Sequence, residues 1–155
     1  MALQQKRALW GLFIGIIWAI AIVVVFMTKG GVTAFSEDVG MRLLVDGIFI
    51  GGLLAYLLMM FLTRQRQGQV AMDERDRLIA SRATVIQLWS IVFSLVIWAI
   101  ALGEIYWDVG QIPVIFPYFI AMSSVVVNIL AQSAGILIGY WRMERNGYLY
   151  GKESY

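Results

Sequence analysis

The sequence contains no cysteine and no histidine, and only two of its 155 residues are prolines. The missing thiols exclude disulfides, cysteine-ligated zinc and thiol catalysis. The missing imidazoles exclude histidine-ligated haem, histidine-based zinc hydrolases and phosphatases with a histidine nucleophile. We also find no nucleophile–base pair and no phosphate-binding loop. We therefore expect no enzyme, no catalytic residue, no cofactor and no metal.

Charged residues are scarce as well, at 14% of the chain against about 25% in soluble domains. Hydrophobic residues make up 61%. A soluble fold must cover itself with polar side chains, whereas lipid removes this requirement. The net charge of +2 gives no reason to expect a nucleic-acid partner. These values predict an all-α integral membrane protein, a single domain over residues 1–155 with the lipid bilayer as its main partner.

Four apolar segments are long enough to cross a bilayer, whose core about 30 Å thick needs roughly 20 helical residues. They cover residues 8–28, 43–63, 83–107 and 117–141 and predict a four-helix bundle. The last helix should begin near Pro117, because proline is tolerated in the first turn. The first segment is longer than the apolar region of a cleaved signal peptide, so we expect it to remain as an anchor.

Basic residues predict the direction of the spans, because they concentrate on the cytoplasmic side of membranes. They precede the first span, follow the fourth and gather in the loop 64–82: Lys6, Arg7, Arg64, Arg66, Arg75, Arg77, Arg82, Arg142, Arg145 and Lys152. The two loops on the other side hold only Lys29 and Arg42. We expect both termini and the loop 64–82 in the cytoplasm, and the protein in the plasma or inner membrane.

Small residues recur at four-residue spacing in three spans, as in membrane helices whose backbones approach closely. The pairs are Gly11 with Gly15, Gly47 with Gly51, and Gly135 with Gly139. We expect these strips to pack the helices of the chain against each other. The alternative is that one strip docks a partner or a second copy of the chain.

Asp46 is the one charged residue within the second span, and Arg42 lies four residues earlier on the same helical face. We expect the two to form a structural ion pair near the membrane surface. Because ionisable groups at membrane depth are often functional, an ion or proton site is the alternative.

Ser124, Asn128 and Gln132 follow each other at four-residue spacing in the fourth span, with Asn128 near mid-membrane. Lipid offers these groups no hydrogen-bond partner. We expect hydrogen bonds to a neighbouring helix, where Gln87, Ser90 and Ser94 of the third span are the candidate partners. A polar path through the bundle is the alternative.

The loop between the second and third spans carries the most distinctive motif, with acids before bases as a helix dipole favours. Its charged residues are Asp73, Glu74, Arg75, Asp76, Arg77 and Arg82. We expect a cytoplasmic helix that starts near Asp73 and continues unbroken into the third span. Interleaved arginines argue against a cation site. Helix capping and surface pairing are the simplest roles, and docking of a partner is the alternative.

The string Asp73-Glu74-Arg75-Asp76-Arg77-Leu78-Ile79, followed by Arg82-Ala83 and a span, resembles a family of small bacterial and archaeal membrane proteins, the domain of unknown function 2178. Outside this string the resemblance lies in hydropathy alone. It implies a four-span fold and no activity. Some relatives are encoded beside small helix-turn-helix regulators, which implies a membrane-bound regulatory role.

The segment Ile17-Trp18-Ala19-Ile20-Ala21 recurs as Ile97-Trp98-Ala99-Ile100-Ala101, at an offset of 80 residues. Both copies lie in spans of the same direction. A duplicated helical hairpin explains the repeat, and coincidence in a chain rich in isoleucine and alanine is the alternative.

Two functions remain open on this basis. The first is a non-enzymatic interaction or regulatory subunit that presents the helix of residues 73–82 to a membrane or cytosolic protein, or to another copy of itself. The second is a small oligomeric channel or transporter with a polar path along the fourth span. An enzyme acting on lipid or quinone is disfavoured, because no catalytic geometry is recognisable.

Overall fold

A computed structural model describes residues 3–63, 74–113 and 115–150, and these residues form helices and turns with no strand. The helices are α1 (Leu3–Thr28), α2 (Gly31–Glu37), α3 (Val39–Leu62), α4 (Glu74–Tyr106) and α5 (Ile115–Tyr150). The predicted all-α class is therefore confirmed. Asp73 and the loop residues 64–72 lie outside the described residues.

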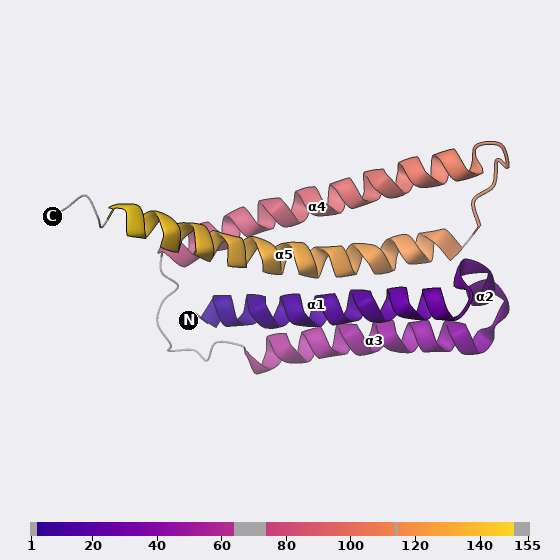
Figure 1. Cartoon of the computed structure of the whole chain (residues 1–155), viewed down its shortest axis with the longest axis horizontal. Coiled ribbons are helices and arrows are strands. Elements are labelled where there is room, and N and C mark those ends of the chain that lie inside the picture. The colour runs from indigo at the N-terminus through magenta and orange to yellow at the C-terminus, as the bar shows by residue number, and fades with distance from the viewer. Residues whose placement is uncertain (1–2, 64–73, 114, 151–155) are drawn as a thin grey trace.

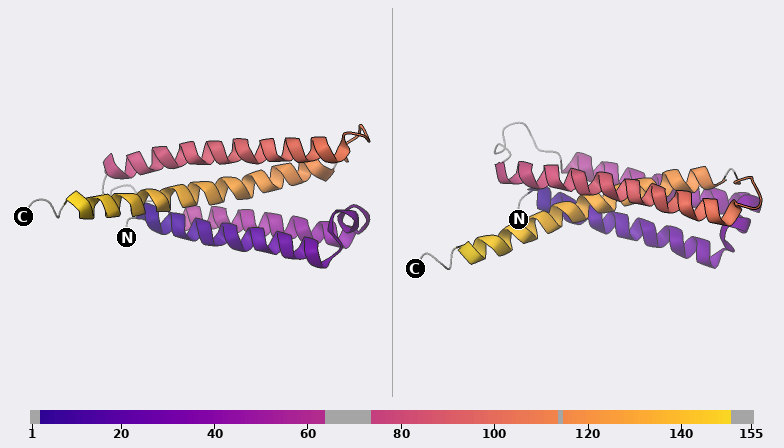
Figure 2. Two further views of the ribbon diagram at one scale, coloured as in Figure 1. Left: turned by 45° about the horizontal axis from the view of Figure 1, so that its top comes forward. Right: turned by 90° about the horizontal axis from the view of Figure 1, so that it is seen from above.

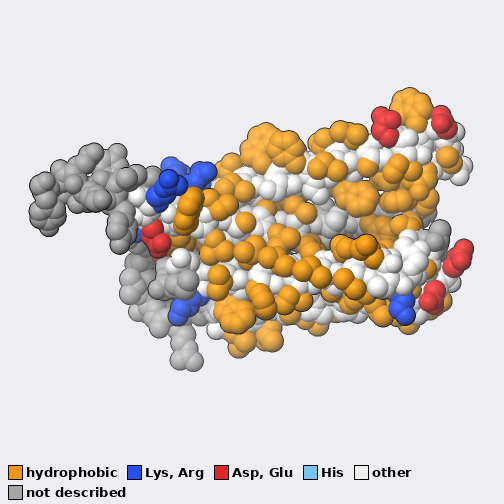
Figure 3. Space-filling model, in the orientation of Figure 1, with side chains coloured by type: hydrophobic (Ala, Val, Ile, Leu, Met, Phe, Trp, Pro, Cys, Tyr) orange, Lys and Arg blue, Asp and Glu red, His pale blue; other side chains and the backbone are white. Residues whose placement is uncertain are grey.

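Four of these helices, α1, α3, α4 and α5, are long and apolar enough to cross a membrane. Large hydrophobic side chains such as Leu54, Phe93 and Ile97 are more than half exposed, and hydrophobic atoms cover the middle of the molecule in Figure 3. Water would penalise such a surface, and lipid does not. The chain therefore has the features of a multi-pass membrane protein.

The four long helices lie side by side in the order α4, α5, α1 and α3 (Figures 1 and 2). Each helix packs most closely on its neighbour in this order, so α5 and α1 have neighbours on both sides. Leu3, Leu62, Glu74 and Tyr150 lie at the same end of the molecule, which we name the terminal end. The predicted juxtamembrane helix and third span form one unbroken helix, α4, from Glu74 onward.

The short helix α2 is a feature that sequence patterns did not predict. Gly30, directly before α2, and Gly31, its first residue, adopt left-handed φ values of +95° and +71°, a conformation that costs glycine little. The chain can therefore turn sharply after α1 and bury Phe35, which is 6% exposed and packs against Val45. The next helix follows almost at once, because the Asp38 carboxylate accepts a hydrogen bond of 2.8 Å from the Gly40 amide at its start.

Glycines allow α5 to approach both of its neighbours. A Cβ atom at Gly139 would lie 2.8 Å from Ile79 Cγ2, and one at Gly135 would lie 3.1 Å from Ala83 Cα, both on α4. On the other side, a Cβ at Gly15 of α1 would lie 2.7 Å from Leu130 Cδ2. A Cβ at Gly11 would meet Ser133 in the same way. The predicted packing role of these two glycine pairs is confirmed.

The third pair, Gly47 and Gly51 of α3, does not pack helices of this chain, so the expectation is wrong for these two residues. Both are exposed, and a Cβ at either would have no neighbour within 4 Å among the described residues. Gly52 has the packing role instead, because its Cα lies against the indole of Trp18, which is 3% exposed. Adjacent positions on a helix point about 100° apart, so one residue decides which face meets α1.

Adjacent glycines of α3 provide a matched test of this contact. We expect Gly52→Ala to destabilise the protein by about 1–3 kcal/mol, since the new methyl group would overlap Trp18. Gly51→Ala should leave stability unchanged or raise it by up to about 1 kcal/mol, since it only removes a glycine from a helix. Unfolding of both variants in one detergent, followed by tryptophan fluorescence, measures the difference. Equal stabilities would contradict the packing described above.

Candidate functional site

The charged residues of the predicted interaction helix lie at the terminal end, on the first turns of α4. Glu74, Arg75, Arg77 and Arg82 are exposed. Asp76 is half-buried instead, because the Tyr140 hydroxyl of α5 donates a hydrogen bond of 2.5 Å to its carboxylate. Asp76 thus joins α4 to α5, and the other four side chains remain accessible.

The polar residues of the fourth span are divided between two neighbours. The Gln87 side-chain amide of α4 donates a hydrogen bond to the Asn128 side-chain oxygen, so the predicted bond between helices forms with one of the three candidate partners. Gln132, one turn further along α5, accepts a hydrogen bond of 3.5 Å from the Tyr56 hydroxyl of α3. Ser124 Oγ is buried and has no partner among the described residues. The three side chains therefore do not share a continuous chain of hydrogen bonds.

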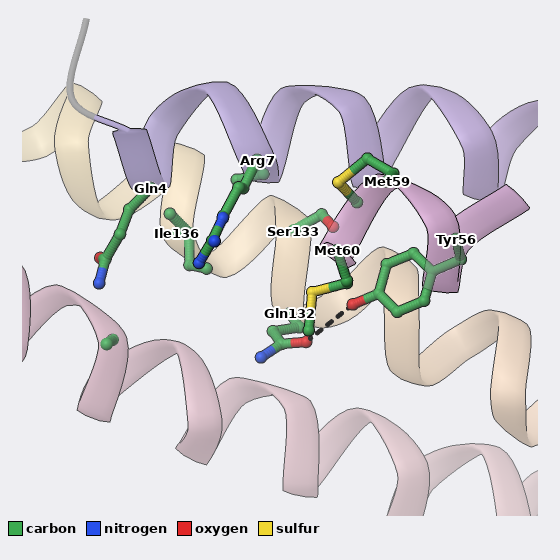
Figure 4. A pocket seen from close by; sticks show the side chains of 10 residues that line it. Gln4, Arg7, Tyr56, Met59, Met60, Gln132, Ser133 and Ile136 are labelled. Atoms are coloured by element: carbon green, nitrogen blue, oxygen red, sulfur yellow. Dashed lines mark hydrogen bonds between the residues drawn. The ribbon is translucent and has the colours of Figure 1, made fainter. Parts of the chain in front are cut away.

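A polar cavity lies between α1, α3 and α5 near the terminal end, where α4 contributes Ala80 to its lining (Figure 4). Its polar lining consists of Gln4, Arg7, Tyr56, Gln132 and Ser133, and its apolar lining includes Met59, Met60 and Ala80. The Arg7 side chain extends from α1 over the cavity in Figure 4, and Tyr56 and Gln132 meet at its other side. Sequence analysis named Gln132 but missed the other polar lining residues as members of a site.

Arg7 is held in this position by Thr63, the residue directly after α3. Its Nε donates a hydrogen bond of 3.0 Å to the Thr63 hydroxyl, and its Nη2 donates to the Thr63 carbonyl. Carbonyls at a helix C-terminus lack partners within the helix and attract cations. The contact fixes the start of α1 against the end of α3.

Asp46 pairs with a tyrosine and not with Arg42, so the predicted ion pair is wrong. The Tyr118 hydroxyl of α5 donates a hydrogen bond to the Asp46 carboxylate, and no ion pair with Arg42 forms among the described residues. Arg42 is exposed and lines an open hollow together with Asp46 and Tyr118. A hydroxyl satisfies a carboxylate without a second charge, which is sufficient near the membrane surface.

Three tyrosines thus provide cross-helix hydrogen bonds that sequence analysis did not predict. Tyr56, Tyr118 and Tyr140 each reach a polar side chain on a different long helix. Their hydroxyl groups lie in or beside apolar segments, where each needs a partner. This requirement is the signal that could have identified them, although it does not reveal which residue each one reaches.

No group of three acidic side chains in residues 3–63, 74–113 and 115–150 is arranged to hold a metal ion. No protein-family model, curated protein or solved structure matches the chain. The resemblance to the domain of unknown function 2178 therefore stays a prediction that depends on the string from Asp73 to Ala83. The geometry and charge of the described residues are thus the guide to function.

The bond between Gln87 and Asn128 can be measured by a double-mutant cycle. We expect Asn128→Leu and Gln87→Leu each to destabilise the protein by about 1–2 kcal/mol, because each leaves an amide without a partner in apolar surroundings. The double variant should lose less than the sum of the two. Unfolding in mixed detergents gives the coupling free energy. A coupling of zero would show that the two amides do not interact in solution.

Proposed function

We propose that the chain is a non-enzymatic interaction or regulatory subunit of the plasma or inner membrane, which binds a partner protein through the exposed face of α4. In this proposal the four long helices form a membrane bundle with both termini in the cytoplasm. The asymmetry of charge supports this orientation. Most lysines and arginines in Figure 3 lie at the terminal end, and most acidic residues lie at the other. Such a distribution is typical of a cytoplasmic terminal end.

The exposure of α4 is the observation that carries the proposal. Only 6% of its apolar stretch is buried within the chain, against 28% for α5. Its packing is concentrated on α5, so most of its circumference is available to lipid or protein. At the terminal end this free surface combines Glu74, Arg77 and Arg82 with the exposed side chain of Leu78. Charged residues around an apolar contact are typical of transient protein interfaces.

The second candidate, an oligomeric channel or transporter, has one observation in its favour. Gln132 of the polar stripe lines the polar cavity near the terminal end. Further along α5, however, Val126 and Ile129 are buried in an apolar cluster with Trp18, and Asn128 is bonded to Gln87. Flux through proteoliposomes that is lost on Asn128→Leu would favour this candidate over the interaction role.

The absence of cysteine allows a direct test of orientation. We expect a single cysteine in place of Glu37 to react with a membrane-impermeant maleimide in intact cells, because Glu37 is exposed at the end opposite the termini. A cysteine in place of Glu144, exposed near the terminal end, should react only after the cells are opened. The reverse pattern would place the termini outside and contradict the proposed orientation.

The partner surface can be tested with a photo-crosslinking amino acid at two exposed positions of the same helix. We expect a crosslinked product of defined mass in cells when the probe replaces Arg82, near the charged end of α4. The same probe at Glu104, exposed at the other end of α4, is the matched control and should not give it.

Two charge reversals extend this experiment. Arg77→Glu should reduce the product at position 82 by at least about tenfold, since like charges across an interface cost several kcal/mol. Glu37→Lys, on the other side of the membrane, should have no effect. Identical products at positions 82 and 104, or a product unaffected by Arg77→Glu, would contradict a partner at this surface.

A further inference from the structure

The polar cavity between α1, α3 and α5 is small and lies where the apolar parts of these helices end. Its volume is about 190 Å³, below the roughly 300 Å³ at which pockets for drug-sized molecules begin. Arg7 precedes the uncharged part of α1, and Thr63 follows the last residue of α3. Positions at this boundary lie at the depth of the lipid headgroups.

Among the residues that the structure describes, one positive charge and no negative charge line the cavity. Arg7 is the only charged member of this described lining, and no aspartate or glutamate belongs to it. Among the described residues Arg7 uses Nε and Nη2 for hydrogen bonds to Thr63, which leaves Nη1 free to donate. The Ser133 hydroxyl lies on the facing side, and its residue is 4% exposed. Fixed donors around a cation favour an oxyanion, to which arginine binds with matched geometry.

A second, independent observation concerns Gln4. Its Oε1 atom is buried and has no hydrogen-bond partner among the described residues. A buried acceptor without a partner costs free energy that a bound donor would recover. Gln4 lines the cavity, and a rotation of its amide group would present this unused acceptor to a ligand held at the donor-rich part around Arg7. A ligand that fits both carries an oxyanion and, next to it, a hydroxyl or ammonium group.

We propose that this cavity binds a phosphate group that carries an adjacent hydroxyl or ammonium donor, as in the headgroup of a glycerophospholipid. Arg7 holds the phosphate, and Gln4 accepts a hydrogen bond from the adjacent donor. One wall includes Met60, which is 46% exposed, so acyl chains attached to the headgroup can lie outside against apolar surface. A free glycerol phosphate has the same headgroup chemistry without the chains.

The full-length protein, purified in a neutral detergent and freed of lipid, allows the test. Dihexanoyl-phosphatidylglycerol should raise the unfolding temperature with saturation, since a ligand that binds only the folded state stabilises it. Dihexanoylglycerol, which lacks the phosphate, should have no such effect. Stabilisation by glycerol 3-phosphate at comparable concentration would identify the free phosphate as the ligand. Stabilisation by dihexanoyl-phosphatidylglycerol without stabilisation by glycerol 3-phosphate would identify the lipid.

Matched variants separate this site from general attraction to charge. We expect Arg7→Gln to weaken binding of dihexanoyl-phosphatidylglycerol at least about tenfold, the effect of one charge-assisted hydrogen bond. Lys6→Gln removes the same charge one residue earlier, outside the cavity, and should bind like the unaltered chain.

Gln4→Met keeps the shape of the side chain and removes its acceptor. It should weaken binding of phosphatidylglycerol more than binding of phosphatidic acid, which lacks the extra headgroup. Gln4→Met also tests the proposed binding site if Arg7→Gln does not fold. Equal affinity of Arg7→Gln and Lys6→Gln, or an unchanged preference in Gln4→Met, would overturn the proposal.

Discussion

The close approach of a neighbouring helix to a glycine is the interaction on which this arrangement depends. Apolar helices gain little by burying apolar surface in lipid, so close packing decides which faces meet. Gly135 and Gly139 bring α5 against Ala83 and Ile79 of α4, and Gly15 brings α1 against Leu130 of α5. Because α5 has such contacts on two sides, it holds the two hairpins together, whereas α4 is attached along one face.

Glycines allow two helices to approach, and hydrogen bonds between polar side chains then fix the position of one helix along the other. Tyr140 with Asp76 and Gln87 with Asn128 link α4 to α5 at two levels, and so restrain sliding of one helix along the other. Two buried side-chain atoms of the predicted spans, Trp18 Nε1 and Ser124 Oγ, have no hydrogen-bond partner among the described residues. A buried polar atom without a partner lowers stability, so the packing around the helices must offset this cost.

Sequence patterns predicted those features that depend on depth in the membrane, and failed on those that depend on direction around a helix. Apolar length identified α1, α3, α4 and α5, and depth alone suggested that Asn128 must find a partner. Gly47 and Gly51 have the same four-residue spacing as Gly135 and Gly139 and predicted helix packing equally well. Among the described residues, however, Gly135 and Gly139 meet a neighbouring helix and Gly47 and Gly51 do not. A glycine pair shows that a backbone can be approached, and the neighbour is set by the other helices.

The repeated segment shows how far the same residues can differ in their contacts. Trp18 and Trp98 occupy equivalent places, and each faces the return helix of its own hairpin. Trp18 packs on Gly52, and the position 80 residues after Gly52 is Gln132. The Trp98 indole, however, donates a hydrogen bond of 2.9 Å to the Ser123 hydroxyl. The two hairpins therefore pack in different registers. The Trp98 ring also lines an apolar groove of about 450 Å³ between α1, α4 and α5, so one motif packs on a glycine in the first hairpin and forms a hydrogen bond beside a groove in the second.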